Sequence, residues 1–377
     1  MFSVLNPFLF LRRNPSKAAP VVMVIMIAVT LVASVVTIVR SINLTISTLY
    51  GYNQYVTGIT PRNNLTVDPD VVAQIKKVPG LGEMMGAHSY TLQIRTIFGR
   101  MMFPLFGMDE AHRAIMLERC GVRLVAGRAP REGQPEAIIS SDVARNMGFK
   151  LGDFVCTPES EDNYAPVPVK IVGLLEGKVW IALTSKSFVD ENSPITGSGY
   201  LLVAKQGYSQ EKLDSDIEKV IDKSRARAWT YEGLLKATQS ALVNLYLILN
   251  IVVGTIVVSI AFVCGLLSNI YFTQRLPEVA TLSAIGYPRK DLLRRAVGET
   301  ILFCAIGWSL GVILTVCFMK AIQIVFLTPK GLLLNPFDPQ ALVFTIPLPF
   351  MVSGVAWLTL GVRLSRLDPV SIIERRA

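Results

Sequence analysis

Four long segments of the chain contain no charged residue, and each is long enough to cross a membrane. They are residues 18–39, 237–274, 300–319 and 339–362. A helix needs about 20 apolar residues to span the hydrocarbon core of a bilayer. The second segment is longer than this and polar at both ends, so we expect one spanning helix that extends into water. Four such segments argue against the alternative, buried core helices of a large soluble enzyme.

The first of these segments follows a basic stretch, as a secretory signal peptide also does. Its apolar part exceeds the roughly 7–15 residues of a signal-peptide core, and no small-x-small cleavage site follows it. We therefore expect a retained membrane helix. The residues before it place several apolar side chains ahead of Arg12 and Arg13, which suits an amphipathic helix at the membrane interface. A disordered N-terminus is the alternative.

The long segment between the first two apolar runs predicts a folded domain of α+β type. Residues 90–98 and 167–175 alternate between apolar and polar positions, as strands do. Asp68 and Ser209 are good N-cap residues in front of apolar positions at helical spacing. Thr230 is expected to cap a helix that runs straight into the second span.

We therefore predict a membrane α-helical fold with four transmembrane helices and an α+β extracytoplasmic domain inserted between helices 1 and 2. The expected segments are 1–17 (amphipathic lead), 18–43 (first span and stalk), 44–229 (domain), 230–274 (stalk and second span), 275–299 (loop), 300–319 (third span), 320–338 (short loop), 339–362 (fourth span) and 363–377 (tail).

The charges of the chain predict its orientation. Only 17% of the residues are charged, whereas a soluble domain has about 25%. The net charge is +9, which in a soluble protein would suggest nucleic acid as a partner. Here the basic residues gather before the first span, in the 275–299 loop and after the fourth span. Because short basic loops stay cytoplasmic, we expect both termini and this loop inside and the domain outside, and we expect no nucleic-acid partner.

Cysteine and histidine usage gives no sign of a metal site. Cys120 and Cys156 lie in the domain and could form a disulfide in an oxidising compartment, or remain free. The other three cysteines fall in the spans, where they serve as small apolar residues. His88 and His112 are the only histidines, and neither has a cysteine or histidine at ligand spacing, so we predict no metal.

Several kinds of chemistry lack their motifs. The chain has no P-loop, no G-x-S-x-G elbow and no H-E-x-x-H pair. The spans hold no charged residue, which argues against an ion-coupled transporter and against an intramembrane protease. One polar residue, Asn250, lies inside the second span with Gly254 one turn further. Small and polar residues mediate helix contacts in lipid, so we favour helix packing over a substrate contact.

The charged loop between the second and third spans predicts two helices. Glu278 favours the positive end of the first helix, and Val279, Leu282 and Ile285 share one of its faces. A short amphipathic helix that is joined to two spans suits docking in the groove of a partner. The alternative is a solvated connector that only obeys the charge rule.

A hinge separates the two predicted helices. Gly286 is a natural residue to end the first helix, and Pro288 begins the second, which leads into the third span. The direction of the chain is therefore expected to change at residues 286–288.

This loop resembles the signature of FtsX/MacB-type ABC transporter permeases. Most specifically, it is similar to the branch with DevC-like exporter permeases, although Ser283 and Tyr287 depart from the common pattern. The closing segment and the domain also carry landmarks of the family in the correct order. The matching residues are Arg275, Glu278, Leu282, Ala284, Ile285, Gly286 and Glu299 in the loop, Leu367, Asp368, Pro369 and Val370 near the C-terminus, and Gly127, Arg128, Ala144, Gly148, Gly152 and Asp153 in the domain.

The resemblance implies a permease subunit of a bacterial-type plasma (inner) membrane. Such a chain is not itself an enzyme and binds no cofactor, while ATP and magnesium are bound by a separate ABC ATPase that docks on the first loop helix. It also implies a permease dimer, of identical or different chains, and a membrane-fusion protein or other extracytoplasmic partner. The implied function is mechanical transmission for export or extraction of a hydrophobic or amphiphilic substrate. The alternative is a signal transducer that activates a cell-wall hydrolase or a sensor and transports nothing.

Overall fold

The computed structural model describes residues 15–97, 99–192, 199–274, 281–282 and 284–365. The chain forms two compact units. The membrane unit consists of Met1–Arg40, Asn244–Gln323 and Leu334–Ala377. The domain unit consists of Ser41–Val243 together with Ile324–Leu333, a short segment from the far side of the third span.

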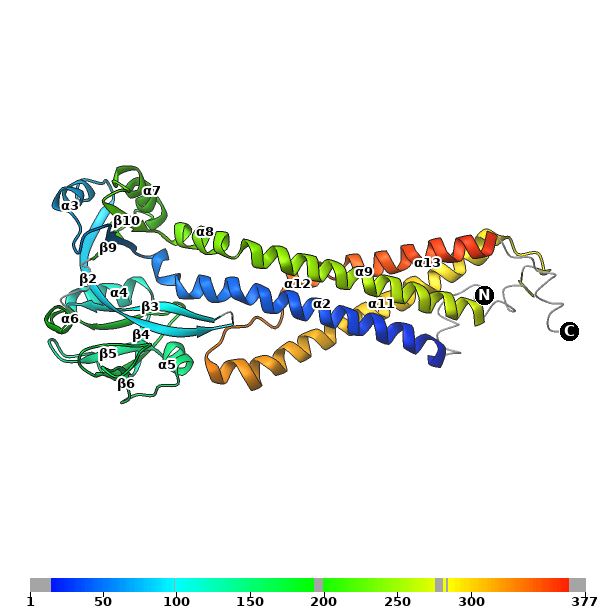
Figure 1. Ribbon diagram of the computed structural model, residues 1–377, viewed down its shortest axis with the longest axis horizontal. Coiled ribbons are helices and arrows are strands. Elements are labelled where there is room, and N and C mark those ends of the chain that lie inside the picture. Colours follow the sequence, from blue (N-terminus) through cyan, green and yellow to red (C-terminus); the bar gives the residue numbers. More distant parts are fainter. Residues whose placement is uncertain (1–14, 98, 193–198, 275–280, 283, 366–377) are drawn as a thin grey trace. The chain divides into compact units, whose positions relative to one another are not determined.

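Among the described residues, four helical segments are long and apolar enough to cross a membrane, which confirms the predicted fold class. The second, third and fourth candidate spans follow the inserted domain in the sequence (Figure 1). The helices concerned are α2 (Pro15–Leu49), α9 (Val243–Gln274), α11 (Arg289–Ile322), the short α12 (Pro339–Val343) and α13 (Pro347–Ser365).

Two glycines on α11 let this helix pack closely against α2. A Cβ atom at Gly307 would lie 2.9 Å from the Cβ of Ile25, and one at Gly311 would lie 2.7 Å from the Cβ of Val29. Small residues at such a crossing bring two backbones together, which is a main source of helix association in lipid. Phe303, one turn before Gly307, is buried in the same cluster.

The fourth span is interrupted, whereas the sequence predicted one segment over residues 339–362. The chain turns between α12 and α13, where Pro347 begins the second helix. The hydroxyl of Thr345 donates to the carbonyl of Leu342 at 2.6 Å and accepts from the indole N–H of Trp308 at 2.9 Å. Side chains thus satisfy polar groups at the break, as a membrane-embedded turn requires.

The domain unit is built on a mixed sheet in the order β10-β1-β9-β2-β3-β8-β5-β7-β4, with β6 paired to β7. β2 is long, and its first half pairs with β9 while its second half pairs with β3. The strands are β1 (Thr57–Pro61), β2 (Leu81–Thr96), β3 (Gly99–Met108), β4 (Arg123–Gly127), β5 (Glu136–Ser140), β6 (Phe154–Cys156), β7 (Val169–Glu176), β8 (Ala182–Ser185), β9 (Gly199–Ala204) and β10 (Ala226–Trp229).

Helices pack on this sheet around two apolar cores. The larger core includes Leu92, Phe103 and Ile139, and the smaller one lies where α3 and α7 meet β1 and β9. The helices of the domain unit are the 3₁₀ turn η1 (Gly51–Gln54), α3 (Pro69–Ile75), α4 (Glu110–Arg119), α5 (Ser141–Met147), α6 (Lys186–Asn192), α7 (Gln210–Val220) and α8 (Tyr231–Ala241).

Local signals predicted two of the three helix caps correctly. Ser209 accepts from the N–H of Lys212 at 3.3 Å, and Thr230 accepts from the N–H of Gly233 at 3.1 Å. Asp68 precedes α3 but makes no capping bond. Its carboxylate instead accepts from Arg225 at 2.7 Å, because a cation offers a stronger, charge-assisted hydrogen bond.

The predicted continuous helix from Thr230 into the second span is wrong. α8 ends at Ala241, and α9 begins at Val243. The N–H of Leu242 is shared between the carbonyls of Thr238, at 3.0 Å, and Gln239, at 3.2 Å. Bonding three residues back tightens the last turn of α8 and ends it.

Cys120 and Cys156 are free thiols, so the disulfide that the sequence left open is not formed. Both side chains are buried in the larger core of the domain. Burial raises the pKa of each thiol to about 12, so both stay protonated and act as small apolar residues.

Candidate functional site

The hinge in the loop between the second and third spans has the geometry of a helix stop. Gly286 has φ +104°, in the region that favours glycine. The N–H of Tyr287 donates to the carbonyl of Leu282 at 3.1 Å. This bond across six residues is the Schellman motif, and Leu282 and Tyr287 supply the apolar contact that often accompanies it.

The second loop helix and the third span form one rod. Pro288 stands at the N-cap of α11 with φ −67° and ψ 146°, and the helix then continues for 34 residues. The N–H groups of Asp291 and Leu292 both donate to the carbonyl of Pro288. A displacement of the hinge is therefore passed directly to the third span.

The predicted docking face is divided by the structure. Leu282 is half-buried and packs against a cluster around Leu292 and Leu360. Ile285, by contrast, is 71% exposed. Glu278 and Val279 lie outside the described residues. Of the described apolar positions on this face, Ile285 is therefore the one most available to a partner.

Glu299, the last residue of the loop resemblance, is buried and paired. It is 1% exposed and accepts from the Nε of Arg295 at 3.3 Å, one turn earlier on α11. A buried carboxylate requires a cation or hydrogen-bond donors. This pair therefore stabilises a charge where α11 enters the span.

Asn250 and Gly254 make no close packing contact within the described chain, so their role in helix packing stays a prediction. Asn250 is exposed on α9, and a Cβ atom at Gly254 would meet nothing within 4 Å. The close helix contact is made instead at Gly307 and Gly311. Sequence reasoning missed these two because a glycine in an apolar run does not show which helix it will face.

The segment between the third and fourth spans is anchored in the domain unit through Asn146 on α5. The side chain of Asn146 is 1% exposed. Its Nδ2 donates to the carbonyls of Arg95 at 2.9 Å, Lys330 at 3.3 Å and Gly331 at 3.4 Å. Its Oδ1 accepts from the N–H of Arg95 at 2.7 Å. We call Asn146 with Lys330 and Gly331 the clip.

Gly331 is the residue that lets the clip close. Its φ is +60°, and a Cβ atom there would lie 2.7 Å from the N of Asn146 and 2.8 Å from the O of Asp142. Any other residue would therefore clash with the backbone of α5. The sequence shows only a Pro-Lys-Gly turn, which does not reveal that this turn packs on α5.

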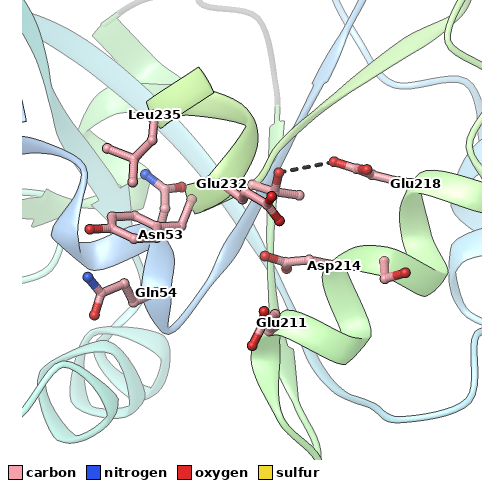
Figure 2. Close-up of a pocket in the computed structure, with 10 residues that line it drawn as sticks. Asn53, Gln54, Glu211, Asp214, Glu218, Glu232 and Leu235 are labelled. Atoms are coloured by element: carbon pink, nitrogen blue, oxygen red, sulfur yellow. Dashed lines mark hydrogen bonds between the residues drawn. The ribbon is translucent and has the colours of Figure 1, made fainter. Parts of the chain in front are cut away.

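The domain unit also contains a polar pocket of about 740 Å³ formed by η1, α7 and α8. Figure 2 shows carboxylates of Glu211, Asp214 and Glu218 on one side and of Glu232 on another. The hydroxyl of Thr230 donates to Glu218 at 3.0 Å, the dashed line in the figure. This concentration of carboxylates favours positively charged groups.

Asp214 is the most buried of these four carboxylates. Burial raises its pKa, hydrogen bonds from Thr57 and Gln210 oppose this, and the neighbouring Glu218 and Glu211 raise it further. Within the described ranges no three His, Cys, Asp or Glu side chains are placed to hold a metal ion.

One known protein family matches the membrane part of the chain. Residues 250–369 match the FtsX-like permease C-terminal family. The membrane part of the chain therefore contains an FtsX-like permease C-terminal domain. The resemblance to FtsX/MacB-type permeases that the loop indicated is thereby confirmed.

Two curated relatives are "Macrolide export ATP-binding/permease protein MacB" of Escherichia coli (strain K12) and of Shigella flexneri. Each is 23% identical to the permease over 231 residues, which covers 55% of this chain and 34% of the relative. The chain thus spans about a third of the length of these relatives.

Two solved structures are similar to about half of the permease. The periplasmic region of MacB from Actinobacillus actinomycetemcomitans has a TM-score of 0.31 and 10% identity, and covers 50% of this chain and 94% of that one. The extracellular domain of the noncanonic ABC-type transporter YknZ from Gram-positive bacteria has a TM-score of 0.30 and 13% identity. This match covers 46% of this chain and 100% of that one.

Proposed function

We propose that this permease is the membrane subunit of an ABC transporter and passes ATP-driven movement from a separate ATPase to the inserted domain. The observation that carries the proposal is Ile285, an isoleucine with 71% exposure at the end of a short helix. Burying such a side chain in a partner's groove stabilises the complex by roughly 1.5–3 kcal/mol. The Schellman stop and α11 connect this point rigidly to the third span.

In this proposal the ATPase binds ATP and magnesium, and the permease binds no cofactor. A ligand shifts a conformational equilibrium only through different affinities for its two states. The ATP-bound and nucleotide-free forms of the ATPase must therefore bind the loop in different arrangements or with different affinities. Because α11 is one continuous rod, that difference becomes a movement of the spans.

The clip is a second connection through which movement of the membrane spans can reach the domain. The chain passes between the two units near residues 40, 243, 323 and 333. The first two connections are the stalks of the first and second spans. The last two enclose Ile324–Leu333, which the clip holds against α5. We propose that the third and fourth spans therefore also act on the domain.

The proposed orientation follows the basic residues. Both termini and the 275–299 loop lie in the cytoplasm, and the domain lies outside a bacterial-type inner membrane. The permease is proposed to dimerise, with the same or a related chain. Asn250 and Gly254, which no part of the described chain covers, suit such a contact because polar and small residues associate helices in lipid.

The proposed outcome is export or extraction of a hydrophobic or amphiphilic substrate, with a membrane-fusion protein or another extracytoplasmic partner. The second candidate is a transducer that activates a cell-wall hydrolase or a sensor. Both candidate functions need movement to pass from the loop through the spans and the clip to the domain. Capture on the full-length permease separates them, because a fusion protein favours export and a hydrolase or a kinase favours signalling.

The docking proposal is tested by Ile285→Lys. The permease is purified with a candidate ATPase, and retention and ATPase stimulation are measured. We expect both to fall about tenfold or more, because a lysine cannot enter an apolar groove. Leu65→Lys is the matched control, since Leu65 is 63% exposed on the domain unit and should change neither. Retention and stimulation unchanged by Ile285→Lys would refute the docking role.

A further inference from the structure

A groove of about 580 Å³ lies between α11 and α13 in the membrane unit. α11 supplies Lys290, Asp291 and Arg294 from its first two turns and apolar residues from the next two. α13 supplies Trp357. The groove therefore changes from charged to apolar along one helix.

The charged end presents two free cations. Lys290 and Arg294 are exposed and one helical turn apart, so both can approach one phosphate. Neither forms an ion pair within the described part of the chain. Asp291 lies between them in the sequence, in the first turn of α11, and leaves this end with a net charge of +1.

The apolar end presents side chains that suit the edge of the hydrocarbon core. Ile301 is 52% exposed and Trp357 is 55% exposed, with Val297 beside them in the groove lining. Eleven residues separate Lys290 from Ile301, which is about 16 Å of helix. Such a length covers a lipid headgroup and the first acyl carbons. Tryptophan is enriched at this depth because its ring is apolar and its N–H is polar.

We propose that this groove binds an anionic glycerophospholipid, with the phosphate on Lys290 and Arg294 and an acyl chain along Val297, Ile301 and Trp357. The carboxylate of Asp291 repels a second negative charge on the lipid headgroup and can accept a hydrogen bond from a headgroup hydroxyl. The preferred headgroup therefore carries one phosphate and hydroxyl donors, as phosphatidylglycerol does. Basic groups at a membrane surface bind anionic lipids in this way.

The position of the groove decides between a lipid and a protein as its occupant. A soluble ATPase can reach Lys290, but Ile301 and Trp357 lie within the uncharged segments 300–319 and 339–362. Only a molecule that is charged at one end and apolar at the other matches the whole groove. This inference requires membrane insertion but not the proposed coupling to an ATPase.

The first test measures lipid retention by native mass spectrometry of the full-length permease, with phosphatidylglycerol or phosphatidylcholine. We expect preferential retention of phosphatidylglycerol. Lys290→Gln/Arg294→Gln should lower it roughly tenfold or more, because both cations that face the phosphate are lost while the repelling carboxylate of Asp291 remains. Lys76→Gln/Lys77→Gln, which removes two exposed charges from the domain unit, should leave retention unchanged.

The second test places the lipid beside Trp357 by fluorescence quenching. Brominated phosphatidylglycerol should quench the permease more strongly than brominated phosphatidylcholine, and Trp357→Phe should remove most of the difference. Equal retention of the two lipids, or no loss in the double variant, would overturn the proposal. So would a double variant that loses a bound ATPase but keeps its lipid, since the groove would then be a protein contact.

Discussion

At the scale of single residues, one ion pair fixes the end of β4 in the domain. Arg128, a landmark of the family resemblance, follows Gly127, whose φ of +79° ends β4. Its guanidinium donates twice to Glu136, once at 2.6 Å, and the N–H of Arg131 donates to the same carboxylate at 2.9 Å. The hydrogen bonds from Arg128, opposed by burial and aided by Arg131, lower the pKa of Glu136 to about 2.

We expect Glu136→Gln to destabilise the domain in a pH-dependent manner. The pKa of Glu136 is lower in the folded chain than its ordinary 4.5, so its stabilisation is present above pH 4.5 and is lost as the pH falls towards 2. The loss at pH 7 should be about 1 kcal/mol, or 2–4 °C in Tm, because water screens the exposed Arg128.

Thermal unfolding of the full-length permease at pH 7 and pH 2 measures this. Glu176→Gln is the control, because Glu176 and Arg123 are both largely exposed and 3.8 Å apart. An equal effect of Glu136→Gln at both pH values would show that lost packing, and not charge, is responsible.

Residues with a local role were predictable from the sequence, and residues with a tertiary role were not. Gly286, Ser209 and Thr230 act on their own helix ends, so their neighbours in the sequence reveal them. The partial burial of Leu282 and the exposure of Asn250 were not predictable, because helical spacing shows which residues share a face but not what covers it.

At the scale of elements, the clip joins a loop to a helix nearly 200 residues away in the sequence. Asn146→Ala removes four hydrogen bonds and leaves the part-buried N–H and carbonyl of Arg95 without their partner. Unsatisfied buried groups cost about 1–3 kcal/mol each. We expect amide hydrogens in α5 and in residues 328–333 to exchange together at least tenfold faster, while α7 is unchanged.

The control for the clip is Asn163→Ala. Asn163 accepts from the N–H of Gln93 at 2.8 Å but does not touch the 328–333 segment. It should therefore leave the exchange of that segment unchanged. Gly331→Ala provides an independent check, since it keeps Asn146 but forces a clash with α5 and should also release the segment. If Asn146→Ala altered α5 alone, the clip would not hold the loop.

The hinge is a second element whose geometry can be tested. Gly286→Ala should weaken the Schellman stop by about 1 kcal/mol, because an alanine is strained at φ +104° although there is room for its Cβ. Gly286→Asn is the matched variant and should cost less, since asparagine tolerates positive φ better. Exchange of the Tyr287 amide reports the effect, and equal exchange in all three proteins would contradict it.

At the scale of the whole molecule, hydropathy predicted the number of spans and the place of the inserted domain, because a bilayer imposes length and polarity on every spanning segment. Contacts between distant segments were not predictable. Hydropathy alone could not show that Ile324–Leu333 folds with the domain, or that the fourth span breaks before Pro347. Both features depend on partners, α5 and Trp308, that lie far away in the sequence.

The last prediction concerns the two sides of the membrane, since transmission requires the loop and the domain to face opposite compartments. Ile285→Cys and Lys77→Cys place exposed thiols on the loop and on α3's C-terminal flank, respectively. A membrane-impermeant maleimide added to intact cells should label Lys77→Cys at once. It should label Ile285→Cys only after permeabilisation, because the basic loop is retained inside. Cys317 is exposed, so it is replaced by serine in both variants and in the background protein, whereas Cys120, Cys156 and Cys304 are buried. Labelling of both variants in intact cells would place the loop on the same side of the membrane as the domain. The permease could then not transmit movement from a cytoplasmic ATPase to the domain.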